Sequence, residues 1–168
     1  AAGLTFDTLL PAPINLHSHC FQRAMTGLSE TSEKPRADFW SWREFMYKFI
    51  NSISPQNYEA ICAFAQMEML EAGYGGLNEF HYVHNDIKGS RFSKIGEMSE
   101  RVLSAASISG IGLTLLPVLY EHGGVSGSAL ISGQDRFGLS YDEFCKLFDE
   151  VDSFPKYSSD IRVGIAAH

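Results

Sequence analysis

The run LLPAPINLHSH, residues 9–19, joins an apolar segment to two histidines and governs how the rest of the chain is interpreted. Leu9–Leu16 is predicted to form a short buried strand, whose start is stiffened by two prolines. Side chains at positions i and i+2 of a strand project to the same face, with their roots about 6–7 Å apart. His17 and His19 can therefore converge on a single metal ion from the end of this strand.

Two interpretations of this histidine pair stay open on spacing alone. A lone His-x-His arises by chance in many chains, and both side chains could be exposed polar residues. Their position favours a metal site, because functional residues of βα units lie where a strand ends and its loop begins. A metal held there would generate hydroxide from water near neutral pH, which is hydrolytic chemistry. A catalytic zinc site typically has three protein ligands, so two histidines do not complete one.

Helices and strands alternate along the remaining chain. Apolar residues at helical spacing predict helices, and short apolar runs bounded by glycine or proline predict strands. Ser54-Pro55 and the capping box of Ser140 and Glu143 mark two helix starts, and Gly110 marks a helix end. Helices are expected over residues 39–50, 54–73, 95–108 and 140–151, strands over 75–84, 111–120 and 161–168, and loops over 31–36 and 121–138.

This alternation predicts an α/β fold of about four βα units, with a parallel sheet buried on both faces. An open doubly wound sheet shares the alternation, but no phosphate-binding glycine loop follows the first strand. We therefore expect a partial (β/α)8 barrel of the metal-dependent hydrolase type, forming a single incomplete domain over residues 1–168. In such a barrel the carboxyl ends of the strands form one rim, where polar side chains share a common mouth. The polar residues near these ends are His17, His19, His81, Tyr82, His84, Tyr120 and His168.

Composition narrows the classes of partner. With 168 residues, 45% of them hydrophobic, and a net charge of −7, the chain is expected to be globular and to act on a small molecule rather than on nucleic acid or a membrane. No long apolar run and no secretory signal is visible. Three scattered cysteines suit reduced thiols, so we expect a cytoplasmic protein. Cys20 would face away from the histidines in a strand and is interpreted as a packing residue.

Longer segments carry a more specific resemblance. They are NLHSHCFQRAM (15–25), FWSWREFMY (39–47), EMLEAGY (68–74), EFHYVH (79–84), GLTLLPVLY (112–120) and GIAAH (164–168). At these segments the chain resembles the amidohydrolase superfamily and, within it, the formimidoylglutamate deiminase family of histidine degradation. The resemblance extends over nearly the whole chain and implies a distorted (β/α)8 barrel, of which this chain holds strands one to four.

The resemblance also implies a reaction and a cofactor. It places one Zn²⁺ on His17 and His19, and it implies that the parent enzyme hydrolyses N-formimino-L-glutamate to N-formyl-L-glutamate and ammonia. The family's other metal ligands, a histidine on strand five and an aspartate on strand eight, have no counterpart in this sequence. Neither do the glutamate and histidine that transfer protons in the family. No catalytic acid or base is therefore assigned within these 168 residues.

Substrate-binding roles follow by resemblance for Gln22, Arg43, Tyr82 and His168. Their chemistry suits a dicarboxylate, because an arginine fork pairs with a carboxylate and an amide offers both a donor and an acceptor. Each also has a plainer interpretation from the residues alone: Arg43 on a solvated helix face, Gln22 in an ordinary loop, and Tyr82 as a packed ring with a wet hydroxyl. His81 either orients a ligand or satisfies buried backbone. The methionines and the tryptophan pair of residues 40 and 42 are interpreted as core or interface filling.

Two other functions stay open. The same fold could act on an aminopyrimidine, on guanine or on another amidine, or the chain could be a non-catalytic half-barrel that pairs with itself or a partner. A half-barrel leaves strand edges and apolar helix faces uncovered. We therefore expect the isolated chain to associate, as a homo-oligomer, or to be partly disordered.

Overall fold

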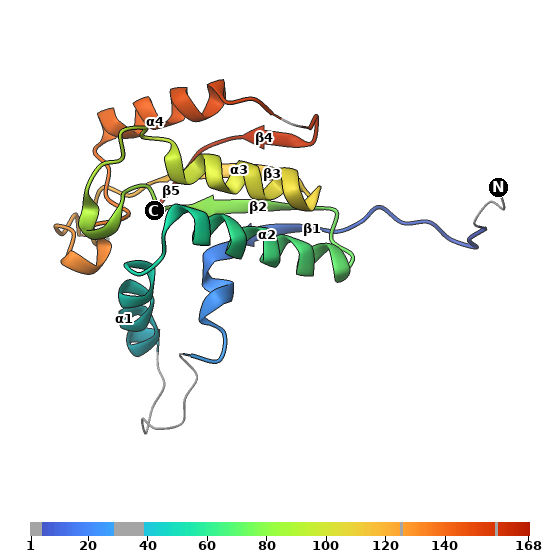
Figure 1. Cartoon of the computed structure of the whole chain (residues 1–168), viewed down its shortest axis with the longest axis horizontal. Helices are drawn as coiled ribbons and strands as arrows, with labels where there is room; N and C mark the ends of the chain where they lie inside the picture. Colours follow the sequence, from blue (N-terminus) through green and yellow to red (C-terminus); the bar gives the residue numbers. More distant parts are fainter. Residues whose placement is uncertain (1–4, 29–38, 125, 157) are drawn as a thin grey trace.

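The computed structural model describes residues 5–28, 39–124, 126–156 and 158–168 (Figure 1). Its strands are β1 (Ile14–Ser18), β2 (Gly76–His81), β3 (Gly112–Leu119), β4 (Ile161–Val163) and β5 (Ala166–Ala167). Its α-helices are α1 (Phe39–Ile50), α2 (Pro55–Glu71), α3 (Glu97–Ser109) and α4 (Tyr141–Ser153). Three short 3₁₀ helices are η1 (Cys20–Met25), η2 (Ile87–Gly89) and η3 (Ser132–Gln134). The loop expected over residues 31–36 lies outside the described residues.

The strands form one parallel arrangement in the order β1-β2-β3-β4, with β5 pairing with β3. The predicted α/β class with helical crossovers is therefore confirmed. The strand expected over 161–168 is divided into β4 and β5, which are separated by Gly164 and Ile165. The Gly164 N–H donates to the Leu115 carbonyl at 2.9 Å, so the backbone stays attached to β3 across the break.

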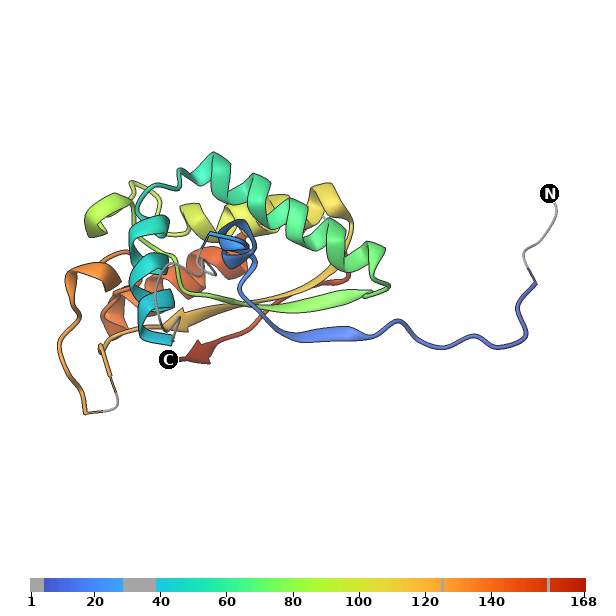
Figure 2. The ribbon, with the colours of Figure 1, turned by 90° about the horizontal axis from the view of Figure 1, so that it is seen from below.

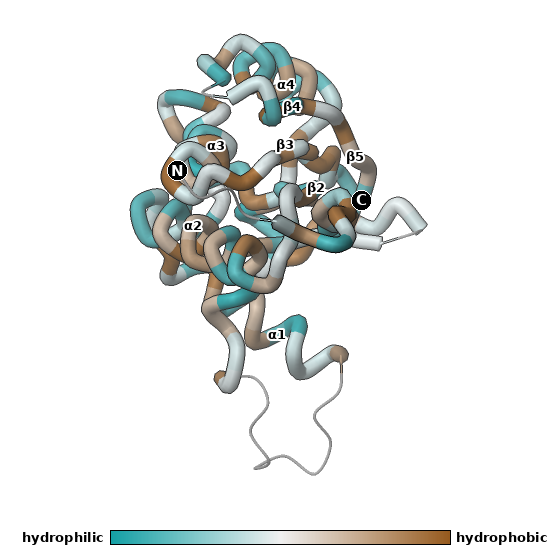
Figure 3. The backbone as a smooth tube through the Cα atoms, turned by 90° about the vertical axis from the view of Figure 1, so that its right-hand side faces the viewer, coloured by the Kyte–Doolittle hydropathy of each residue, from teal (hydrophilic) through white to brown (hydrophobic). Residues whose placement is uncertain are grey.

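Helices α2, α3 and α4 lie on one side of the sheet (Figure 2). Seen along the strands, these helices form an outer arc, and β2, β3 and β5 lie inside it (Figure 3). Between the two layers, side chains such as Leu77, Leu113 and Leu115 are buried. Leu16 and Ile165 are 69% and 64% exposed. The prediction of a sheet buried on both faces is wrong for the described part of the chain, because its helices cover only one face.

The first strand begins five residues later than predicted. Leu9 and Leu10 are 84% and 79% exposed and lie outside any strand. Proline lacks the N–H that a strand ladder needs, and Pro11 and Pro13 place two such gaps before Ile14. The first link to the sheet is the bond from the Gly75 N–H to the Pro13 carbonyl, at 2.9 Å. The sheet register therefore starts at Ile14.

Local signals set the helix ends as predicted. At α2 the Ser54 hydroxyl accepts from the Asn57 N–H at 3.2 Å. At α4 Ser140 and Glu143 form a reciprocal capping box. Gly110 ends α3 in the left-handed conformation, with φ of 80°, which glycine adopts without steric cost. None of the helices within the described ranges is both long and apolar enough to cross a membrane.

Candidate active site

The two histidines of the opening motif meet at their outer ring nitrogens. The Nε2 atoms of His17 and His19 lie 3.1 Å apart, and the ring planes are 86° apart. Two imidazole nitrogens that bind one zinc ion at about 2.0–2.1 Å with tetrahedral geometry lie about 3.3 Å from each other. The observed separation is close to this value, so the pair fits one shared metal ion.

The tautomer of His19 is set by the backbone of β2. Its Nδ1 lies 2.8 Å from the Phe80 carbonyl oxygen, which can only accept. Nδ1 therefore carries the proton, and the lone pair on Nε2 is free to bind a metal. Burial lowers the pKa of His19, which favours the neutral, metal-binding form of the ring, although the bond to Phe80 opposes this shift.

A register irregularity at the end of β1 brings the two rings together. Two residues of β1 lie between Asn15 and Ser18, whereas one residue of β2 lies between their partners. The Asn15 Oδ1 accepts from the His17 N–H at 3.1 Å within this irregularity. His17 lies in β1, whereas His19 follows its end and caps η1. The prediction that the two rings converge is confirmed, but they do not project from a regular strand.

The histidine pair opens into a cavity of about 470 Å³ at the carboxyl ends of the strands. All six residues predicted for metal or substrate binding line it. They are His17, His19, Gln22, Arg43, Tyr82 and His168. The predicted common mouth is thus present for these residues. None of the described residues that line this cavity is a carboxylate, although the chain as a whole is acidic.

Gln22 and Tyr82 contact each other inside the cavity. The Gln22 Nε2 donates to the Tyr82 hydroxyl oxygen at 3.0 Å, and that hydroxyl lies 3.6 Å from the Met46 sulfur. Tyr82 is buried, and burial raises the pKa of its phenol, which therefore stays protonated at neutral pH. Met46, interpreted from sequence as core filling, is buried and also lines the cavity.

Arg43 projects from α1 among aromatic rings. Its guanidinium carbon lies 4.5 Å from the centroid of Trp40 and 5.7 Å from that of Tyr47. Such rings hold a guanidinium by cation–π attraction and leave its donor edge available. The interpretation of Arg43 as a residue on a solvated helix face is wrong, because the side chain lines the cavity.

His168 is held against Tyr120. Their ring centroids lie 3.7 Å apart with planes 23° from parallel, and the Tyr120 hydroxyl accepts from the Gln134 Nε2 at 2.9 Å. Desolvation lowers the pKa of His168, and burial raises that of Tyr120 to about 12. Gln134 and Phe137 also line the cavity and were missed from sequence. They come from the loop of residues 121–138, whose glycine- and serine-rich sequence carries no signal of a site.

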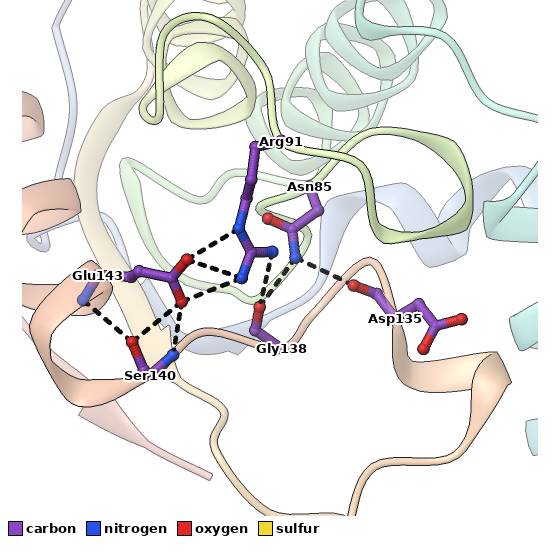
Figure 4. A network of polar contacts seen from close by, with 6 residues as sticks. All are labelled: Asn85, Arg91, Asp135, Gly138, Ser140 and Glu143. Carbon is purple, nitrogen blue, oxygen red and sulfur yellow. Dashed lines mark hydrogen bonds and ion pairs between the residues drawn. The ribbon is translucent and has the colours of Figure 1, made fainter.

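A polar network fixes this loop (Figure 4). The Asn85 side chain donates to the carbonyls of Asp135 and Gly138 at 3.0 and 2.8 Å. Arg91 binds both carboxylate oxygens of Glu143 at 3.0 Å. These contacts join the segment after β2 to the segment before α4, so the wall that carries Gln134 and Phe137 is preformed.

His81 and His84 do not belong to the common mouth. Successive strand residues face opposite sides, so Phe80 lines the cavity while His81 points toward the helices. The His81 Nδ1 lies 3.2 Å from the Tyr58 hydroxyl, and the His84 Nε2 donates to the Val118 carbonyl at 2.9 Å. The expectation that they share the mouth is wrong, and His84 satisfies buried backbone instead.

Cys20 packs as predicted, but not from a strand. It begins η1 and is 2% exposed. The pKa of the Cys20 thiol is raised by two causes. The larger is the contact with the Cys62 thiol, and the second is burial. Cys20 is therefore a protonated packing residue, and it does not line the cavity that His17 and His19 line. Within the described ranges no group of three or more histidine, cysteine, aspartate or glutamate side chains could hold a metal ion.

Residues 8–137 match the amidohydrolase family. The chain belongs to this family. This amidohydrolase chain is 43% identical over 160 residues to formimidoylglutamate deiminase from Pseudomonas aeruginosa, across 95% of this chain and 35% of that protein. It also resembles the crystal structure of an amidohydrolase from Brucella melitensis, with a TM-score of 0.87 and 42% identity over 94% of this chain and 35% of the other. The amidohydrolase chain thus spans about a third of the length of these relatives.

More distant structures show the same fold. A zinc complex of atrazine chlorohydrolase from Arthrobacter aurescens TC1 matches with a TM-score of 0.69 at 18% identity, across 94% of this chain and 34% of that one. Guanine deaminase from C. acetobutylicum with bound guanine matches with a TM-score of 0.62 at 14% identity, across 94% of this chain and 32% of that one. The parallel sheet with its helices is consistent with the predicted partial barrel of the amidohydrolase type.

Proposed function

We propose that the protein containing this chain hydrolyses the formimino C–N bond of N-formimino-L-glutamate, giving N-formyl-L-glutamate and ammonia. The observation that carries the proposal is the approach of the His17 and His19 Nε2 atoms to 3.1 Å, beside a cavity lined by four candidate substrate-binding side chains. The 43% identity to a formimidoylglutamate deiminase supports this substrate over other amidines.

A zinc ion is the metal proposed for the histidine pair. Neutral imidazole nitrogen is a common zinc ligand, and the Nε2 lone pair of His19 is oriented for it by the Phe80 carbonyl. When bound, zinc lowers the pKa of water and polarises the carbon–nitrogen bond to be cleaved. The further ligands and the proton-transfer groups are proposed to lie in parts of the protein outside this chain.

The cavity suits a substrate that carries carboxylates. Arg43 supplies a fixed positive charge in a cavity whose described lining holds no Asp or Glu. An arginine fork binds a carboxylate through two parallel hydrogen bonds. Gln22, Tyr82 and His168 add further donors and acceptors to the lining. We propose that Arg43 and His168 bind the glutamate end, and that Gln22 and Tyr82 face the part of the substrate nearer the metal.

Ammonia release from the complete purified protein tests the proposal. We expect release from N-formimino-L-glutamate, and at least about a hundredfold lower kcat/KM with guanine or an aminopyrimidine. We expect His17→Ala and His19→Ala to lose both bound zinc and activity. Zinc binding without turnover of N-formimino-L-glutamate, but with turnover of another amidine, would reassign the substrate and keep the amidohydrolase chemistry.

A further inference from the structure

We infer that Glu79 is a positioning residue for the metal-binding corner, acting on His19 through the peptide group that follows it. Glu79 lies in β2 and is fully buried on the helix-covered side of the sheet. Its Oε1 accepts from the backbone N–H of Cys20 at 2.8 Å. Cys20 directly follows His19, so this bond fixes the chain where it leaves the metal-binding motif.

Two consecutive residues of β2 hold His19 from two directions. The carbonyl of Phe80 accepts from the ring Nδ1 at 2.8 Å, and the carboxyl of Glu79 accepts from the next peptide N–H. The first contact sets the rotation of the imidazole ring, and the second sets the position of the backbone that carries it. Because both anchors belong to one strand, the His19 Nε2 has a fixed position relative to the sheet.

The corner needs this second anchor because β1 has already lost its regular ladder. The register changes between Asn15 and Ser18, and Ser18 is the last residue of β1 that pairs with β2. The next helix, η1, begins at Cys20, and its N-cap residue His19 makes no side-chain capping bond. Glu79 supplies an acceptor for the Cys20 N–H, which is the first of the η1 N–H groups that have no carbonyl partner within the helix.

A buried carboxyl group in this position lowers the stability of the fold. Desolvation raises the pKa of Glu79, and only hydrogen bonds from Cys20 and Ser18 oppose that rise. A leucine would fill the same space between β2 and the helices without that cost. A leucine could not provide the oxygen that accepts from the Cys20 N–H. The position of Glu79 is therefore explained by the geometry of the corner and not by core packing.

The inference rests on the proposed metal role of His17 and His19, and zinc affinity of the complete protein tests it. Zinc content is measured after equilibration with graded concentrations of a chelator, beside the urea-unfolding midpoint of each variant. Glu79→Gln keeps an oxygen acceptor at the same reach, and we expect its zinc affinity within about threefold of the parent. Glu79→Asp withdraws the acceptor, and Glu79→Leu removes it. For both we expect zinc affinity to fall about 10- to 100-fold.

Leu113→Ala is the matched control, because it creates a cavity in the same buried layer at a residue of β3 that pairs with Leu77 and Ile161 and not with Glu79. We expect it to lower the unfolding midpoint while zinc affinity stays within about threefold. If Leu113→Ala weakens zinc binding as much as Glu79→Leu at equal loss of stability, Glu79 is only structural. Unchanged affinity in Glu79→Asp, or a tenfold loss in Glu79→Gln, also overturns the inference.

The remaining outcomes separate the two proposals. If Glu79→Leu does not fold, the comparison of Glu79→Gln with Glu79→Asp still decides. If the parent protein binds zinc and His17→Ala does not, the metal site stands whatever the Glu79 variants do. If the parent binds no zinc, the proposed function and this inference fail together.

Discussion

Gln22 and Tyr82, which are 60 positions apart in the chain, are joined by a hydrogen bond of 3.0 Å between the amide nitrogen and the phenol oxygen. The bond links η1 to the residue that follows β2, and both side chains line the cavity together with His17 and His19. Neither side chain therefore needs to be ordered when a ligand binds. Preorganisation of this kind lowers the entropic cost of binding.

Removal of the Tyr82 hydroxyl tests this relationship. In Tyr82→Phe the Gln22 amide loses its acceptor while the aromatic ring is kept. We expect kcat/KM for N-formimino-L-glutamate to fall about tenfold, which corresponds to one hydrogen bond of about 1–1.5 kcal/mol. A double-mutant cycle with Gln22→Leu should give a non-additive result, because both changes break the same bond. Strict additivity would show that the two side chains act on the ligand independently.

Arg43→Lys tests whether the guanidinium fork is the carboxylate-binding group. Lysine keeps the charge but cannot form two parallel bonds, and it stacks less well on Trp40 and Tyr47. We expect kcat/KM for N-formimino-L-glutamate to fall at least about 30-fold, chiefly through KM. With an amidine substrate that lacks the α-carboxylate, parent and variant should differ by less than about threefold. An equal loss with both substrates would assign Arg43 a structural role.

Sequence patterns were sufficient for the elements whose ends are set locally. The Ser54 cap, the capping box of Ser140 and Glu143, and Gly110 each act within a few residues, and each helix end lies where its signal places it. The first strand begins later than its apolar run predicts, because Pro11 and Pro13 cannot donate to a ladder. The prediction that the second face of the sheet is buried is also wrong, because apolar composition does not show which element covers a face.

The site was predictable where its residues follow from strand ends, and not where they come from loops. The histidine pair and Tyr82 lie at the ends of β1 and β2, and the family resemblance added Gln22, Arg43 and His168. Gln134 and Phe137 reach the cavity only because distant contacts fold the loop before α4 over it. Glu79 did leave a signal, since it is a charged residue within an otherwise buried strand.

Acid should destabilise the chain through His84. Burial lowers the pKa of this residue from 6.5 to about 4. Between these pH values the unfolded chain binds a proton that the folded chain does not, so the free energy of unfolding falls as the pH falls. For His84 alone the loss is about 3 kcal/mol between pH 6.5 and pH 4. The lowered pKa of His81 acts in the same direction, whereas the raised pKa of Glu79 opposes both.

His84→Gln isolates this contribution, because glutamine can still donate to the Val118 carbonyl but does not titrate. Urea unfolding of parent and variant between pH 4.5 and pH 7.5 provides the measurement. The stability difference between parent and variant should shift toward the variant as the pH falls below 6.5. A pH-independent difference would mean that His84 is protonated equally in the folded and unfolded states.

Arg136 should be the most costly arginine to remove among those described, because it is the only one that is fully buried. Its guanidinium donates to the carbonyls of Ile50, Ile53 and Asn85, which joins the end of α1 to the loop before α4. Arg136→Met keeps most of the apolar volume but leaves these carbonyls without that donor. We expect unfolding to become easier by about 3 kcal/mol or more, since each unpaired buried group costs about 1–3 kcal/mol.

Arg23→Met is the matched control for this change. Arg23 forms a bidentate pair with Glu68, but the two side chains are 40% and 35% exposed. Exposed ion pairs contribute about 0–1 kcal/mol, so we expect little change in the urea midpoint. Equal effects of the two substitutions would contradict the anchoring role. A large effect confined to Arg136→Met, with reduced protection of the Phe137 and Leu139 amides in hydrogen exchange, would show that this buried guanidinium holds the cavity wall in place.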